Sequence, residues 1–134
     1  SEYMTASGFD YGEAGVFGLE AMRAAYNYGG EWLDSLMEYL KGSLDFLCDY
    51  VEKNMPKAKV MVPEATYLVW MDLSGYGMDG EQLHETLLKR GKVWLDEGYL
   101  FGKAGEGFER INIACPRATL EEGLKRMSDC LGEI

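Results

Sequence analysis

Two polar residues that could take part in binding, Arg110 and Asn112, lie two positions apart in segment 108–115. This segment alternates apolar and polar residues, which predicts a β-strand with both side chains on one face. A guanidinium can bind a carboxylate through two parallel hydrogen bonds and stays charged at every relevant pH. Arg110 could equally be a surface arginine paired with Glu106 or Glu109.

Other groups that could do chemistry have simpler interpretations. His84 is the only histidine, and no serine or cysteine motif surrounds it, which favours an ordinary helix residue over a catalytic base. The three cysteines are widely spaced and form no CxxC pair, so neither a disulfide framework nor a zinc site is indicated. The glycine-rich stretch 98–107 precedes a strand instead of linking a strand to a helix, which argues against a phosphate-binding loop.

Charge and length narrow the possible functions. The 134 residues carry 13 basic and 23 acidic side chains, a net charge of −10, which disfavours nucleic-acid and anionic-membrane partners. No apolar run approaches the roughly 20 residues that cross a bilayer, and no secretory signal is visible. We therefore expect one soluble, cytoplasmic domain with reduced thiols.

The periodicity of the chain predicts an α/β fold of the α+β sandwich type, with helices covering a small, mostly antiparallel sheet. Residues 1–15 are expected to be an irregular leader, and residues 16–134 to form the domain. A helical pattern begins at 16, is broken at Gly29–Gly30 and ends before Pro56. The other expected elements are strands at 58–62, 66–72, 93–95 and 108–115, a helix from Asp79 to Gly91, and a final helix with a Thr119–Glu122 capping box.

Several segments in a fixed order resemble the end of the MalY/PatB-type cystathionine β-lyases. They are FGLEA at 17–21 with AY at 25–26, EWLD at 31–34, EATYLVWMD at 64–72, GYLFG at 98–102 and FERINIACPR at 108–117. A single segment of this kind would be weak support, but their shared order and spacing over nearly the whole chain are specific.

The resemblance implies the C-terminal small domain of a fold-type-I pyridoxal-phosphate (PLP) enzyme, a homodimer in which a large domain holds the cofactor. The family's Schiff-base lysine follows Ser-x-x, and none of the eight lysines here has serine three residues before it. The chain is therefore expected to hold no catalytic or cofactor-binding residue, to bind no PLP covalently and to be inactive alone. The intact parent is expected to cleave the C–S bond of L-cystathionine or a similar amino acid to pyruvate, ammonia and a thiol.

The resemblance also implies roles for individual residues. Arg110 matches the family's arginine that binds the substrate α-carboxylate, and Asn112 would support it or the adjacent loop. Tyr99 and Tyr67 would lie near the same cleft. Glu97 departs from the pattern, because a proline is expected before Gly98.

Two alternatives remain open. The chain could be a stand-alone binding module that keeps this fold and uses exposed Trp32, Met37 and Tyr67 for a partner. The parent could also be a true aminotransferase, since a carboxylate-binding arginine indicates an amino-acid substrate without identifying it.

Overall fold

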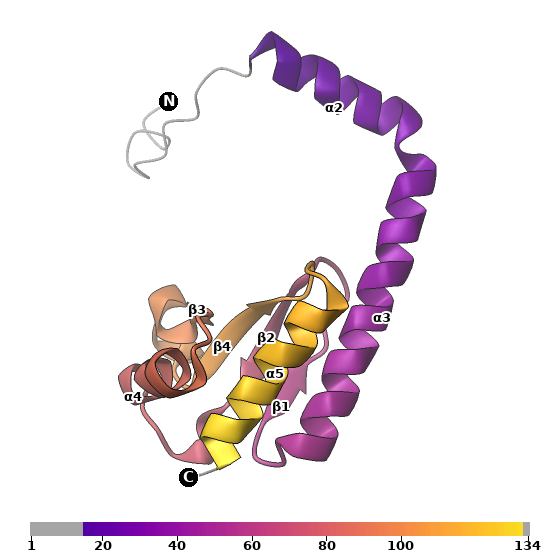
Figure 1. Cartoon of the computed structure of the whole chain (residues 1–134). Helices are drawn as coiled ribbons and strands as arrows, with labels where there is room; N and C mark the ends of the chain where they lie inside the picture. The colour runs from indigo at the N-terminus through magenta and orange to yellow at the C-terminus, as the bar shows by residue number, and fades with distance from the viewer. Residues whose placement is uncertain (1–14, 133–134) are drawn as a thin grey trace, which may run out of the picture. The chain divides into compact units, whose positions relative to one another are not determined.

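The computed structural model describes residues 15–132, which form two compact units, one up to Met37 and one from Glu38 onward (Figure 1). The expected leader, apart from Gly15, lies outside the described residues. The main helices are α2 (Val16–Tyr28), α3 (Gly30–Asn54), α4 (Gly80–Glu85) and α5 (Arg117–Gly132). The strands are β1 (Lys59–Met61), β2 (Leu68–Asp72), β3 (Asp96–Glu97) and β4 (Phe108–Asn112).

The predicted helix break at the glycine pair is confirmed. The Gly29 backbone N–H donates to the Ala25 carbonyl at 2.8 Å, and α3 starts at the next residue. A Cβ at Gly29 would lie 2.5 Å from the Ala25 oxygen, so a larger residue could not keep this backbone. Glycine therefore terminates the first helix here.

The sheet has the strand order β1-β2-β4-β3, and all three pairings are antiparallel. Within it, Trp70 of β2 and Asp96 of β3 lie directly opposite Arg110 of β4. Directly opposed residues of antiparallel strands point to the same face. The register therefore brings three side chains, distant in sequence, onto one surface.

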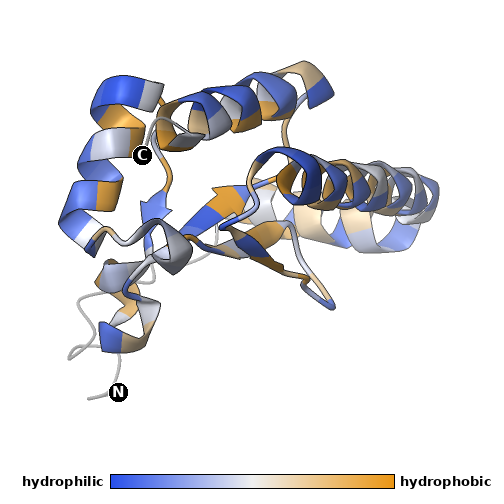
Figure 2. Cartoon of the chain, turned by 90° about the horizontal axis from the view of Figure 1, so that it is seen from below, coloured by the Kyte–Doolittle hydropathy of each residue, from blue (hydrophilic) through white to orange (hydrophobic). Residues whose placement is uncertain are grey.

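The core lies between the other face of the sheet and the helices of the second unit. Figure 2 shows the hydrophobic sides of these helices turned towards the sheet. Burying such side chains contributes roughly 1.5 to 3 kcal/mol each and fixes the sheet against α3, α4 and α5. Residues that are almost fully buried include Leu47, Val69, Met71, Leu83, Leu87, Ile113, Leu124 and Met127.

The predicted mixed fold with a small antiparallel sheet is confirmed, and so is the helix start at Asp79, where the structure shows a capping box with Gln82. The Gln82 N–H donates to Asp79 Oδ1 at 2.8 Å, and the Asp79 N–H donates to Gln82 Oε1 at 3.3 Å. The helix that follows widens into a π-helical turn, Thr86–Gly91, where the sequence predicted only a continuing helix.

Several predicted boundaries are wrong. Strands β1, β2 and β4 are shorter than the predicted 58–62, 66–72 and 108–115, and two further elements are misplaced. The third strand lies at Asp96–Glu97 and not at 93–95, because its two residues are defined by pairing with β4. The final helix begins at Arg117, and the Thr119 N–H donates to the Pro116 carbonyl at 2.9 Å. Thr119 is therefore inside the first turn and does not cap the helix with Glu122.

Candidate substrate-carboxylate site

The candidate site is centred on Arg110, in the middle of β4. Strand alternation places Arg110 on the face away from the core, while its neighbours Glu109 and Ile111 are buried. The Arg110 side chain is 24% exposed, so its head reaches solvent while its stem is covered.

The guanidinium is paired with Asp96. Arg110 Nε donates to Asp96 Oδ2 at 3.2 Å, and Nη2 donates to the same oxygen at 2.7 Å. The alternative pairing with Glu106 or Glu109 is wrong: Glu109 is buried on the opposite face, and Glu106 accepts from the Gly80 N–H at 2.6 Å. The cation is therefore held by an acidic neighbour from the adjacent strand.

Two aromatic rings complete the surroundings of the cation. The guanidinium carbon lies 4.6 Å from the ring centroid of Phe101 and 5.9 Å from that of Trp70. The two rings meet edge to face, with centroids 5.2 Å apart. Cation–π attraction of this kind favours a charged group at a fixed place and adds roughly 0.5 to 1 kcal/mol at exposed sites.

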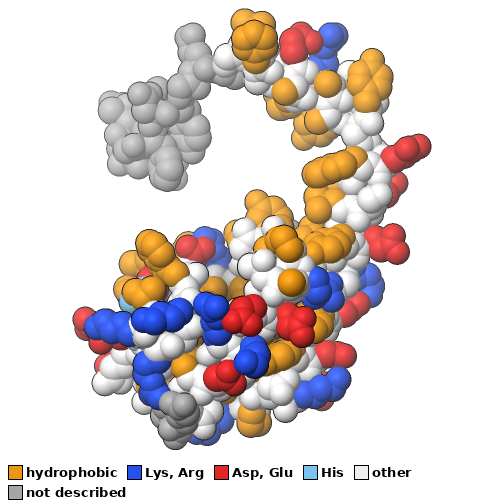
Figure 3. All heavy atoms as spheres, in the orientation of Figure 1, with side chains coloured by type: hydrophobic (Ala, Val, Ile, Leu, Met, Phe, Trp, Pro, Cys, Tyr) orange, Lys and Arg blue, Asp and Glu red, His pale blue; other side chains and the backbone are white. Residues whose placement is uncertain are grey.

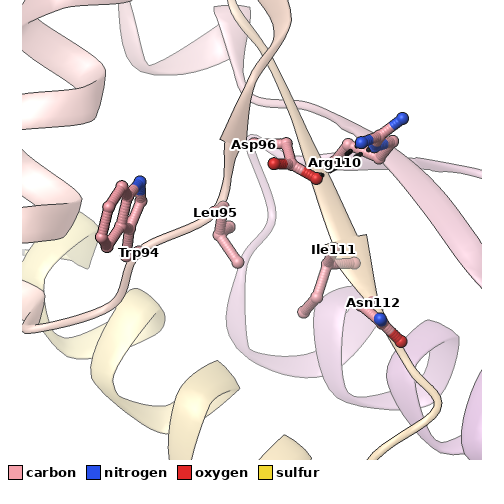
Figure 4. Close-up of a pocket in the computed structure, with 6 residues that line it drawn as sticks. All are labelled: Trp94, Leu95, Asp96, Arg110, Ile111 and Asn112. Atoms are coloured by element: carbon pink, nitrogen blue, oxygen red, sulfur yellow. Dashed lines mark hydrogen bonds and ion pairs between the residues drawn. The ribbon is translucent and has the colours of Figure 1, made fainter. Parts of the chain in front are cut away.

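A pocket of about 270 Å³ adjoins the ion pair and is lined by Trp94, Leu95, Asp96, Arg110, Ile111 and Asn112. Figure 4 shows Asp96 and Arg110 reaching towards each other from neighbouring strands, with one end of the guanidinium directed away from Asp96. Asn112 Oδ1 accepts from the Ala114 N–H at 2.8 Å. In this structure the asparagine therefore holds the backbone after β4.

The structure brings only two of the four predicted binding residues together at this pocket. Tyr99 lines a different pocket, with Asp79, Glu81 and Glu106. Tyr67, just before β2, is exposed and lines neither of these pockets; its carbonyl accepts from the Ile113 N–H at 3.0 Å.

Sequence reasoning missed Asp96 and Trp70 as neighbours of Arg110. Both belong to the site because they are directly opposite Arg110 in the sheet. Alternation within β2 could have placed Trp70 on the polar face, but the strand register is a long-range property that one sequence does not reveal.

A second group of titratable residues lies on the other face of the same strands. Glu97 lies directly opposite Glu109, and both side chains are buried. His84 Nδ1 lies 2.6 Å from Glu97 Oε1. Burial, and then the negative charges of Glu97 and Asp96, raise the pKa of Glu109 from its ordinary 4.5 to about 7.

The residues present do not fit PLP as a covalently bound group. All eight lysines are exposed, and none has the Ser-x-x context of the family's Schiff-base lysine. No group of three His, Cys, Asp or Glu residues that could hold a metal ion occurs within residues 15–132. Nor is any helix in this described range long and apolar enough to span a membrane.

Known proteins resemble this chain both in sequence and in structure. The cystathionine β-lyase PatB of Bacillus subtilis is 41% identical over 120 residues, covering 90% of this chain and 31% of that protein. Protein MalY of Escherichia coli is 39% identical over 119 residues, covering 89% and 30%. The PLP-bound C–S lyase of Staphylococcus hominis, in complex with L-cycloserine, superimposes with a TM-score of 0.84 at 34% identity, covering 99% and 36%. No family model matches the chain.

The fold matches that of fold-type-I pyridoxal-phosphate enzymes over the part of them that this chain covers. Within that class, the chain is homologous to a part of the MalY/PatB-type cystathionine β-lyases. It spans about a third of the length of the curated relatives it matches.

Proposed function

We propose that this chain is the C-terminal small domain of a PLP-dependent C–S β-lyase, and that Arg110 binds the α-carboxylate of its amino-acid substrate. The observation that carries the proposal is the position of Arg110: a partly exposed guanidinium held by Asp96 and two aromatic rings at the edge of a pocket. A preplaced guanidinium binds a carboxylate with two charge-assisted hydrogen bonds and so orients the substrate.

The proposed parent contributes a large PLP-binding domain and forms a homodimer. Coverage of about a third of the relatives supports a larger parent. The apolar side chains exposed on α2 and the first turns of α3 also support it, because such patches mark interaction surfaces (Figure 3). They include Phe17, Tyr26, Tyr28, Trp32 and Leu33.

In the proposed parent reaction, the C–S bond of L-cystathionine or a similar amino acid is cleaved with water to pyruvate, ammonia and a thiol. The cofactor supplies the electron sink, and Arg110 of this chain orients the substrate. The chain alone is expected to release no pyruvate from L-cystathionine with added PLP. The same proposal includes a cytoplasmic location, which rests on the similarity of this chain to the cystathionine β-lyases.

The proposal is tested by Arg110→Lys in the full-length protein that contains this chain. Lysine keeps the charge but loses the planar pair of donors. We expect the KM for L-cystathionine to rise roughly 10- to 100-fold, which corresponds to the roughly 1.5 to 3 kcal/mol of hydrogen bonds to a charged group. Arg126→Lys on α5, where the arginine pairs with Glu122, is the matched control. An unchanged KM for Arg110→Lys would refute the assignment.

The same preparations show whether the parent is a lyase or an aminotransferase. The Arg110 test alone does not, since Arg110 would bind the substrate carboxylate in either reaction. A lyase releases pyruvate from L-cystathionine without a second substrate, whereas an aminotransferase requires a 2-oxo acid to accept the amino group. Transfer of the amino group to the 2-oxo acid without pyruvate release would show that the parent is an aminotransferase and not a lyase.

A second candidate function is a stand-alone binding module. The exposed side chains of Trp32, Met37 and Tyr67 favour it, because they could receive a partner. Light scattering after size exclusion tests it: a monomer at high concentration that captures no partner argues against the module.

A further inference from the structure

The side chain of Asp96 approaches Arg110 from one defined edge of the guanidinium. Asp96 Oδ2 accepts from Nε at 3.2 Å and from Nη2 at 2.7 Å. Nε carries one hydrogen and each Nη carries two, so this contact uses two of the five N–H donors. The three that remain belong to Nη1 and Nη2, at the end of the side chain.

Two aromatic rings also lie beside the cation. The guanidinium carbon lies 4.6 Å from the Phe101 ring centroid and 5.9 Å from that of Trp70. Both hydrogen bonds that Arg110 makes within residues 15–132 go to Asp96. The end edge, Nη1 with Nη2, is therefore the part of the guanidinium left for a carboxylate, which matches it with two parallel hydrogen bonds.

The free energy that this ion pair contributes to folding is too small to explain why Asp96 occupies this position. Its side chain is 55% exposed, and ion pairs this close to water contribute little to stability. An acidic group beside the arginine also reduces the positive charge that attracts a carboxylate. What the contact provides is orientation, because it limits rotation of a long side chain whose end must meet the substrate.

We infer that Asp96 is the positioning residue of the carboxylate site: it holds the Nε–Nη2 edge of Arg110 and thereby presents the Nη1–Nη2 edge to the substrate. This inference rests on the proposed function of Arg110. It assigns a role in substrate binding to a residue that touches the arginine and not the substrate.

The test compares Asp96→Ala and Asp96→Asn in the full-length protein. Alanine removes the acceptor, and we expect it to raise the KM for L-cystathionine about tenfold while kcat stays within twofold. Asparagine keeps a side-chain oxygen that can accept both N–H bonds, and we expect it to restore KM to within about threefold of the unmodified protein. A purely structural defect would lower kcat through loss of active protein and leave KM unchanged.

Inhibition by propionate isolates the carboxylate contact, since this ligand has a carboxylate and no amino group. Asp96→Ala should weaken its inhibition by the same factor as KM, and Asp96→Asn should not. Asp129→Ala is the matched control, because Asp129 forms an exposed ion pair with Lys125 on α5, away from this site.

The outcomes separate this inference from the proposed function. If Asp96→Ala lowers KM, Asp96 competes with the substrate and does not position the arginine, which overturns the inference. An unchanged KM in Asp96→Ala, alongside a raised KM in Arg110→Lys, overturns the role of Asp96 alone. An unchanged KM in both variants overturns the inference together with the proposed function.

Discussion

The buried carboxyl of Glu109 makes the stability of this chain dependent on pH in a direction that can be worked out. Its pKa is about 7 in the folded protein, mainly because of burial and then because of Glu97 and Asp96, and 4.5 is the ordinary value. At 1.36 kcal/mol per pKa unit, the difference corresponds to at most about 3 kcal/mol.

The sign follows from which state binds the proton. Below pH 4.5, Glu109 is protonated in both the folded and the unfolded chain, so its contribution to stability is fully present. Between pH 4.5 and 7 only the unfolded chain releases the proton, and the free energy of unfolding falls as pH rises. Above about pH 7 the folded chain ionises too, and the loss is complete.

Glu109→Gln removes this ionisation while keeping the size of the neutral carboxyl. We expect the variant and the unmodified chain to differ by less than about 0.5 kcal/mol at pH 4, and the variant to be more stable by up to about 3 kcal/mol at pH 8. The His84–Glu97 pair is present in both proteins, so their difference reports on Glu109.

The measurement is urea unfolding of the chain at pH 4, 6 and 8, followed by circular dichroism. Glu121→Gln makes the same substitution at an exposed position on α5 and should follow the unmodified chain within about 0.5 kcal/mol at each pH. A Glu109→Gln variant that is less stable at pH 8, or whose difference from the unmodified chain does not change with pH, would refute the reasoning.

Two further substitutions test local features of the fold. A Cβ at Gly98 would lie 2.1 Å from the Gly105 carbonyl oxygen, so Gly98→Ala should destabilise the chain by more than about 2 kcal/mol in urea unfolding, whereas Gly123→Ala, with nothing within 4 Å, should not. Asp79→Ala removes the cap of α4 and should cost about 1 kcal/mol, measured in the same way; no loss would show that the capping box is dispensable.

The elements that a single sequence predicts well are those with strong local signals. The glycine pair at 29–30, the helix start at Asp79 and the alternation around Arg110 all act through neighbours in sequence, and each corresponds to an observed feature. The strand that it misplaces, β3, depends on a distant partner. β3 has two residues, too few for any periodicity, and exists only because β4 lies beside it.

The same contrast between local signals and distant partners holds for the residues of the candidate site. Arg110 and Asn112 could be chosen from alternation and from family resemblance, because both lie on one strand. Asp96 could not, because it lies beyond the predicted strand 93–95 and contacts Arg110 only through the register of β3 and β4.

The short strands at both borders of the sheet have a consequence for handling the isolated chain. β1 and β3 have three and two residues, so each offers few unpaired backbone groups to which a foreign strand could add. Fibre growth by strand addition is accordingly disfavoured at either border. Association of isolated copies would have to proceed through side chains such as Phe17 and Trp32, and dilution or mild detergent should reverse it.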